Sequence, residues 1–308
     1  MVLICRRVHF YEINDQPWFP QYLREKVQSC LTLAWTFRAP IIQKTSPAEL
    51  VVTTLDHTLS DRIWQYTYVD FCAGAGGPTP YIEKELNAQL SSRASDSPVL
   101  APNGLTPRSP MAKNVPFKDS AVQFVLTDIH PHIPDWTEAS KRSENLSFIA
   151  TPVDAANAPT DITSQEGKGI FRLYNLAFHH FDDDLGSAIL KNTLETADGF
   201  GIFELQERTV SSFITMCLLG LLFFLITPFY FWRSPGHLFF TYVIPIIPAV
   251  LVFDGYVSSL RTRSPEEIHA LMEKCGASSN GWTIRSGHEQ HTWPTGYMTW
   301  VIGIRGKN

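Results

Sequence analysis

Two adjacent histidines, His179 and His180, are well suited to move a proton near neutral pH, because imidazole titrates there. They directly follow Ile170–Ala177, an apolar run whose composition predicts a buried strand. Ligands of α/β sheets bind beyond the carboxyl ends of the strands, so a histidine at this place can act as a general base. One of two neighbouring histidines usually packs inside or caps the next helix, so we expect at most one catalytic member.

A glycine-rich loop, Gly74–Gly77, follows a second apolar run, Tyr66–Cys72. Pro78 and Pro80 are compatible with the first turn of a following helix, and glycines allow positive φ and a close approach of the backbone to a ligand. A strand, a glycine loop and a helix in this order predict a site for a nucleoside cofactor. The G-x-G-x-x-G spacing would place Thr79 where a small residue is required, which disfavours NAD.

Four motifs in order resemble those of class I S-adenosylmethionine-dependent methyltransferases. Asp70–Pro78 resembles the first motif, and Val122–Asp128 resembles the second strand with its terminal acidic residue. Val153–Ala155 resembles the adenine-side motif, and Leu173–Phe181 resembles the fourth strand and the loop that faces the substrate. The resemblance extends from about Tyr66 to Ile304.

The resemblance implies an α/β fold with a Rossmann-like, mostly parallel sheet, an antiparallel last strand and helices on both faces. It also implies S-adenosyl-L-methionine as the methyl donor, with Asp128 accepting hydrogen bonds from the ribose and the pair His179 and His180 on the acceptor side. The donor-binding residues that it implies are Asp70, Cys72, Ala73, Gly74, Ala75, Gly76, Gly77, Asp128, Ile129, Asp154, Ala155, Ala177 and Phe178.

Strands and helices alternate along the chain, which predicts a sheet covered on both faces. Helices are expected at Pro20–Phe37 and Asp182–Thr196, and Ser264, Pro265 and Glu267 together mark another helix start. The expected strands are Tyr66–Cys72, Val122–Asp128, Ser147–Thr151, Ile170–Ala177, Gly199–Leu205, Trp282–Ser286 and Tyr297–Ile304, the last two as an antiparallel hairpin.

The expected domain organisation is a methyltransferase core with additions. Residues 61–209 and 256–308 form the core, residues 1–60 an N-terminal helical cap, and residues 210–255 a hydrophobic hairpin. Residues 91–116, rich in Ser and Pro, are expected to form a mobile surface insertion. In the cap, Trp18 and Phe19 are candidates to close over the sulfonium group, with core packing as the alternative.

The hydrophobic block contains two uncharged runs, Ser212–Trp232 and Leu238–Phe253. The first is long enough to cross a membrane, and the second is short and interrupted by prolines. Strands of one sheet flank the block, so it must leave the domain and return. A membrane hairpin, a re-entrant or interfacial pair, and a buried soluble lid all meet this demand. We favour membrane attachment, with Arg208 and Arg261 suggesting a domain that faces the cytoplasm.

Composition restricts the function further. The 308 residues are 44% hydrophobic, with a net charge of −5 and a pI of about 6.1, which disfavours nucleic acid as a partner. The five cysteines are scattered without a C-x-x-C pair, so no disulfide framework and no metal site are expected. The sequence does not indicate the oligomeric state.

These features predict a membrane-associated methyltransferase that uses S-adenosyl-L-methionine on a small lipophilic acceptor. The acceptor class is inferred from the apolar block alone. The alternative is a non-catalytic membrane-associated binding or scaffold protein that retains the fold. Binding of the methyl donor would distinguish the two.

Overall fold

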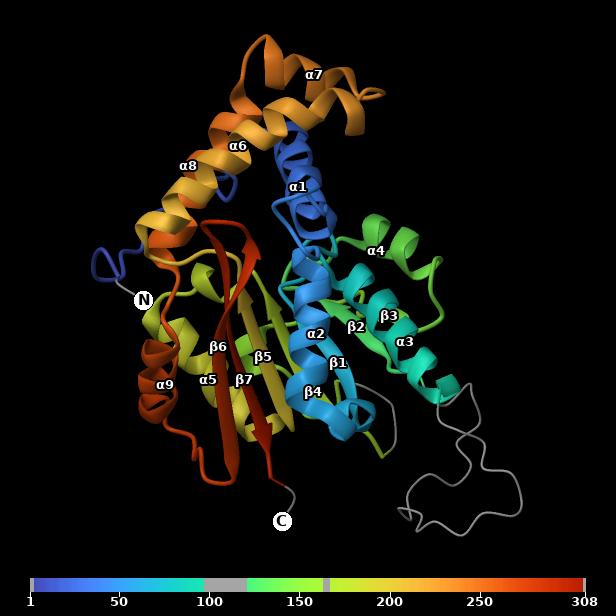
Figure 1. Ribbon diagram of the computed structural model, residues 1–308. Coiled ribbons are helices and arrows are strands. Elements are labelled where there is room, and N and C mark those ends of the chain that lie inside the picture. The colour runs from blue at the N-terminus through green and yellow to red at the C-terminus, as the bar shows by residue number, and fades with distance from the viewer. Residues whose placement is uncertain (1–2, 97–120, 163–166, 307–308) are drawn as a thin grey trace.

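The computed structural model describes residues 3–96, 121–162 and 167–306. In this part of the chain, a seven-stranded sheet runs through the centre of the molecule and helices cover it (Figure 1). The insertion expected at residues 91–116 lies mostly outside the described residues. The prediction of an insertion is wrong for residues 91–96, because helix α3 (Thr79–Asp96) continues through them.

The strands lie in the order β3-β2-β1-β4-β5-β7-β6. The pairs from β3 to β5 are parallel, whereas β7 is antiparallel to both β5 and β6. This confirms the predicted fold class, a Rossmann-like class I methyltransferase sheet. The order reverses between β1 and β4, where such sheets bind ligands. The strands are β1 (Tyr66–Phe71), β2 (Phe124–Thr127), β3 (Leu146–Phe148), β4 (Gly169–Asn175), β5 (Gly199–Glu204), β6 (Trp282–Thr292) and β7 (Gly296–Arg305).

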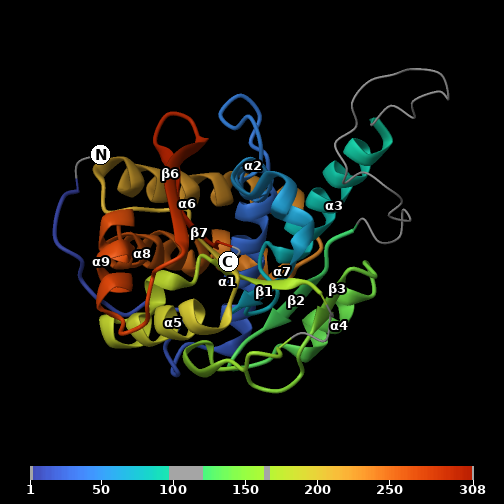
Figure 2. The same cartoon turned by 90° about the horizontal axis from the view of Figure 1, so that it is seen from below.

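Successive side chains of each strand point to opposite faces of the sheet and build two cores. In β1, Tyr68 belongs to one core and Val69 to the other. Helices α2 (Pro47–Leu59) and α3 cover the first face, and α5 (Asp183–Thr196) and α9 (Pro265–Lys274) cover the second. Figure 2 shows α2 and α5 on opposite sides of the sheet. Helices therefore cover both faces of the sheet, and a ligand can reach it at the edge where the parallel strands end.

The sequence left several elements unpredicted. Helix α2 begins with a capping box formed by Ser46 and Glu49, the same pattern that correctly predicted α9. The short helix α4 (Ile133–Ser140) was also missed. Strand β6 continues six residues beyond its predicted end at Ser286, because it pairs with β7 along its whole length.

Three helices leave the sheet after β5 and return to α9, which confirms the predicted inserted hairpin. They are α6 (Val210–Tyr230), α7 (Pro235–Tyr242) and α8 (Ile246–Arg261). Helix α1 (Gln21–Thr36) packs against them beyond the carboxyl edge of the sheet (Figure 1). The shared core contains Phe19, Leu23, Val27, Cys30, Phe223, Ile247, Val250 and Leu251.

Among the described residues, α6 alone is a single helix long and apolar enough to cross a membrane. Helices α7 and α8 meet this criterion only as a pair, and they are bent by 72° at their junction. One third of the most apolar window of α6 is buried inside the protein. The hairpin therefore has one face that packs on the protein and one that is exposed.

Candidate functional site

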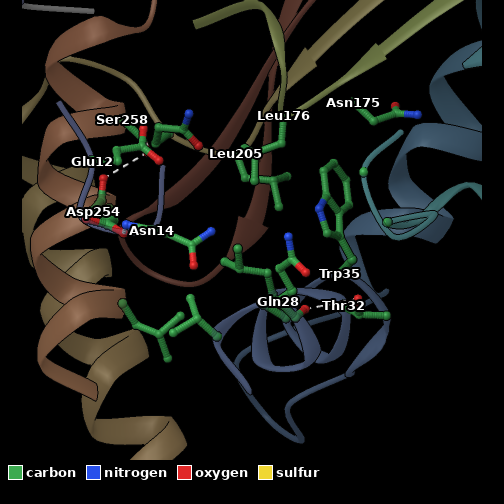
Figure 3. A pocket seen from close by; sticks show the side chains of 18 of the residues that line it. Glu12, Asn14, Gln28, Thr32, Trp35, Asn175, Leu176, Leu205, Asp254 and Ser258 are labelled. Atoms are coloured by element: carbon green, nitrogen blue, oxygen red, sulfur yellow. Dashed lines mark hydrogen bonds between the residues drawn. The ribbon is translucent and has the colours of Figure 1, made fainter. Parts of the chain in front are cut away.

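A cavity of about 270 Å³ opens beyond the carboxyl ends of β1, β4 and β5. Its floor is formed by the glycine loop and by the residues that follow β4 and β5, and its other walls come from α1, α6, α8 and the segment that precedes α1. Figure 3 shows Glu12, Asp254 and Ser258 on one side and Trp35 and Asn175 on the other. The volume is near the lower end of small-molecule sites, roughly 300–1,000 Å³.

The glycine loop presents open backbone to this cavity. Gly74 has a φ of +52°, and a Cβ atom placed on it would meet no atom within 4 Å. Cys72, at the end of β1, also has a positive φ of 63°, which turns the chain sharply out of the strand. Of the predicted loop residues, those that line the cavity are Ala73, Gly74, Ala75 and Gly77. A ligand can therefore lie directly on the backbone at Gly74.

Asp70 lies behind the loop and does not line the cavity. Its Oδ2 accepts a hydrogen bond from Thr79 Oγ1 at 2.5 Å, and Thr79 Oγ1 in turn accepts one from Asn175 Nδ2 at 3.1 Å. Burial raises the pKa of Asp70 to about 7. Asp70 therefore ties the start of α3 to the end of β1, and it acts on the cavity through Thr79 and Asn175.

Asn175 is the last residue of β4, and its side chain lies beside the glycine loop with one hydrogen bond unmade. Its Nδ2 donates to Thr79, but its buried Oδ1 has no hydrogen-bond partner among the described residues. A buried acceptor without a partner costs about 1–3 kcal/mol. The next residue, Leu176, has a φ of 54°, and both residues line the cavity. Asn175 Oδ1 is thus an acceptor beside the cavity that no described residue uses.

The predicted ribose and adenine residues lie at the adjoining edge of the sheet, outside the cavity wall. Asp128 accepts hydrogen bonds from the backbone N–H groups of Gly74 at 2.9 Å and His130 at 2.8 Å. Ile129 and Asp154 are exposed, and Asp154 caps a short 3₁₀ turn at Ala155–Asn157. Carboxylate oxygens have about four acceptor positions, so Asp128 retains capacity for hydroxyl groups.

Three further predicted donor-binding residues are buried, and two of them, Ala155 and Phe178, belong to the second core. Ala155 and Ala177 are buried, and the ring of Phe178 packs edge-on against Tyr174 and Phe181. Cys72 packs partly against the same core. None of the four lines the cavity. They support the walls of the site from behind.

His179 lies on a 3₁₀ turn, Phe178–His180, and is held between two carboxylates. Its Nδ1 is 2.8 Å from Glu204 Oε2, and its Nε2 is 3.4 Å from Glu12 Oε1. Burial alone would lower its pKa, but the two carboxylates outweigh burial and raise the pKa to about 9. The pKa of Glu12 falls correspondingly to about 2, because contacts with His179 and neighbouring cations outweigh its burial. His179 is thus an imidazolium at neutral pH, without a free lone pair for a substrate proton.

His180 has the geometry of a general base. Its Nδ1 donates to Asp15 Oδ2 at 3.0 Å, which leaves Nε2 as the nitrogen with the lone pair. The side chain is 32% exposed and lines the cavity. The predicted pair therefore divides into one structural cation, His179, and one histidine available to a substrate.

Glu12, His179 and His180 lie close enough together to hold a metal ion, with ligand atoms within 4.8 Å of one another. The facing oxygen, Glu12 Oε1, already accepts from Ser258 at 2.8 Å and from Arg261 at 3.4 Å. The Arg261 guanidinium would repel a metal cation at this oxygen. The described side chains therefore form an ion-pair network.

The segment before α1 supplies site residues that sequence reasoning missed, above all Glu12 and Asp15. It is fastened to α8, since Asp254 accepts from the N–H groups of Ile13 and Asn14. A carboxylate or amide without a motif gives no local signal of this role. Neither Trp18 nor Phe19 lines the cavity: Trp18 is 68% exposed, and Phe19 packs in the hairpin core, which was the alternative. The indole ring that lines the cavity is that of Trp35.

Comparisons with known proteins are distant. No protein-family model and no curated protein sequence matches this chain. The plantazolicin methyltransferase BpumL, solved with SAH and a monoazolic desmethylPZN analog, is similar with a TM-score of 0.49 at 13% identity over 95% of this chain and 93% of that chain. The methyltransferase domain of bacterial CtHen1 has a TM-score of 0.42 at 9% identity over 85% and 97%.

A putative Zn-dependent alcohol dehydrogenase from Rhodobacter sphaeroides is similar to the same degree, with a TM-score of 0.45 at 11% identity over 91% of this chain and 98% of that chain. Likenesses at this level do not bear on function. The fold assignment depends on the strand order and directions of this chain itself.

Proposed function

We propose that this protein is an S-adenosyl-L-methionine-dependent methyltransferase that acts on a small lipophilic acceptor at a membrane surface. The observation that carries the proposal is that one cavity contains two complementary groups of residues, which we call its two halves. One half is the open backbone of Gly74 beside the unpartnered Asn175 Oδ1, and the other is the dyad of His180 and Asp15. The first suits a methyl donor, and the second suits an acceptor that loses a proton.

The residues present fit the donor. S-Adenosylmethionine, when bound, supplies an electrophilic methyl group on a positively charged sulfur. Asn175 Oδ1 suits its ammonium group, since that acceptor is buried and unpartnered. The loop backbone at Gly74 would hold the amino-acid end, and Asp128, fixed by the N–H groups of Gly74 and His130, would hold the ribose hydroxyls. The full donor would extend from the cavity to the adjoining edge of the sheet.

The residues around His180 fit a base. Nε2 of His180 takes the proton that the acceptor oxygen or nitrogen loses, and the Asp15 carboxylate stabilises the imidazolium that results. Arg261 holds the backbone under both histidines, because it donates to the carbonyl oxygens of His179 and His180 at 3.2 and 2.8 Å. Positioning and exclusion of water supply the remaining acceleration expected for a methyl transfer.

The outer face of the hairpin supports the proposed membrane attachment. Helix α6 exposes a stripe of large apolar side chains that includes Leu218, Leu221, Leu225 and Phe229. Exposed contiguous apolar surfaces of this kind mark interaction with membranes or partners. Aromatic residues at the far end, such as Trp232, suit the membrane–water interface.

The position of helix α1 favours a hairpin that lies at the membrane interface over one that crosses the membrane. It accompanies the hairpin as far as α7, where His237 Nε2 lies 3.3 Å from Lys26 O. If the hairpin crossed the membrane, Arg24, Glu25 and Lys26 of α1 would enter the hydrocarbon. Burying each of these charges there would cost at least about 2.5–3.5 kcal/mol. We therefore infer that only the outer face of the hairpin contacts lipid, with the sheet on the cytoplasmic side.

The test is donor binding followed by transfer. The full chain in lipid nanodiscs should bind S-adenosylmethionine and S-adenosylhomocysteine in calorimetry, and should transfer an isotopically labelled methyl group to a component of a lipid extract. Failure to bind either molecule would refute the proposal and favour a non-catalytic scaffold protein. Flotation with vesicles, compared between the full chain and Leu221→Glu/Leu225→Glu, tests the attachment.

A further inference from the structure

A second hollow of about 110 Å³ adjoins the cavity. It lies between α6, the segment after α1 and the turn that joins β6 to β7. The two spaces share four wall residues, Ala34, Leu205, Met216 and Leu219. The hollow therefore lies next to the reaction cavity, across these shared side chains.

The wall of this hollow offers little to a polar ligand. Its polar side chains bond to the protein itself: Thr215 Oγ1 donates to Thr295 Oγ1 at 2.9 Å, and His291 Nε2 lies 3.2 Å from the carbonyl oxygen of Leu205. Burial lowers the pKa of His291 to about 4, so the ring is uncharged at neutral pH. Leu222 and Ile226 add aliphatic surface. An aliphatic chain fits such a wall, because it leaves no hydrogen bond unmade.

The outer end of the hollow reaches the surface that faces lipid in the proposed function. Leu218 and Trp293 line the hollow, and they are 46% and 64% exposed. Leu218 belongs to the apolar stripe of α6. The inner end reaches the wall of the reaction cavity at Met216. The hollow thus lies between the exposed hairpin surface and the wall of the reaction cavity.

The cavity itself restricts the charge of the acceptor head. Three carboxylates line it, from Glu12, Asp15 and Asp254, and no lysine or arginine is among the described lining residues. The His179 imidazolium also lines the cavity, and together with Arg261 it offsets part of this charge. An anionic head would face net repulsion here, whereas an amine or a hydroxyl finds acceptors.

We propose, on the basis of the proposed function, that the methyl acceptor is a single-chain amphiphile with an amine or hydroxyl head, and that its aliphatic chain occupies the second hollow. The head oxygen or nitrogen forms a bond to the methyl carbon as the sulfur–carbon bond breaks. The sulfur keeps the electron pair of that bond, and the proton of the head passes to Nε2 of His180. The chain enters from the lipid side of α6.

The experiment measures chain-length dependence. The full protein, saturated with S-adenosylhomocysteine, is titrated calorimetrically with n-alkylamines from hexylamine to dodecylamine and with the carboxylates of equal length. Affinity should rise about fourfold for each methylene that enters the hollow, until the hollow is filled. Leu222→Trp, inside the hollow, should abolish this rise, whereas Leu221→Trp, on the exposed face of the same helix, should preserve it.

Leu222→Phe is a milder variant, and unchanged affinity for S-adenosylhomocysteine shows that each variant is folded. An equal rise in the wild type and in both Leu222 variants would overturn the chain site. Carboxylates that bind as tightly as amines would overturn the assignment of the head. A rise that depends on Leu222 in a protein that binds no S-adenosylhomocysteine would support the chain site and refute the methyl transfer.

Discussion

The two halves of the cavity are built in different ways. The donor half comes from one continuous stretch around Gly74 together with the ends of two adjacent strands. The acceptor half combines Asp15, His180 and Asp254, which come from widely separated parts of the chain. A half that is local in sequence leaves a motif, whereas a half assembled by tertiary contacts does not. The sequence therefore predicted the glycine loop and the two histidines, whereas Asp15 and Asp254 join them only through the fold.

The largest effect is expected for His180→Gln. Loss of the base should lower turnover about 10²–10⁴-fold, with unchanged affinity for S-adenosylhomocysteine. Labelled methyl transfer and calorimetry on the same preparation measure the two quantities. Asp15→Asn, which keeps a hydrogen-bond acceptor at the ring, should have a smaller effect. Equal turnover of the wild type and His180→Gln would remove the base from the acceptor half.

Gly74→Leu should act on the opposite half. Its side chain would project into the open space of the donor site, and overlap of this kind costs about 3 kcal/mol, or about 100-fold in affinity. Gly276→Leu is a matched control, because Gly276 also has a positive φ, +85°, and open space around its Cβ position. Both variants should lose similar stability in chemical denaturation, and only Gly74→Leu should lose the donor. A similar loss of donor affinity in both would mean that backbone strain alone explains it.

Asp128→Ala should weaken donor binding by about 1–3 kcal/mol, which is about 5- to 150-fold, because the ribose hydroxyls lose their acceptor. Calorimetry with S-adenosylhomocysteine gives the value. Asp154→Ala, one loop further along the edge and exposed, should have a smaller effect. The reverse order would place the ribose at Asp154 and redraw the donor half.

The smallest effect concerns stability and pH. The pKa of His179 in the folded protein, about 9, exceeds the ordinary histidine pKa of about 6.5. Its contribution to stability is therefore complete below about pH 6.5 and is lost as the pH rises through 9. Urea denaturation at pH 7 and pH 9.5 should show this loss in the wild type. His179→Gln should be less stable at pH 7 and should show less further loss. Parallel losses in both proteins would contradict a protonated His179.

The extent of successful prediction follows the range of the interactions. The glycine loop, the positions of the strands along the chain and the apolar block after β5 depend on local patterns, and all three were predicted, whereas the order of the strands in the sheet was not. Capping correctly marked α9, and the same signal at Ser46 went unused. The division of labour between His179 and His180 could not be predicted, because it depends on Glu12 and Glu204, which meet only in the fold.

In the proposed function, the hairpin would both attach the protein to a membrane and form part of the site. Met216 and Leu219 of α6 and Leu251 of α8 form part of the cavity wall, and Arg261 at the end of α8 holds the turn under both histidines. On this proposal, truncating the hairpin would open the cavity to solvent as well as detach the protein from lipid. A form that does not bind lipid would therefore be made by replacing the outward residues Leu221, Leu225 and Phe229 with charged residues, while the inward side of the same helix is kept unchanged.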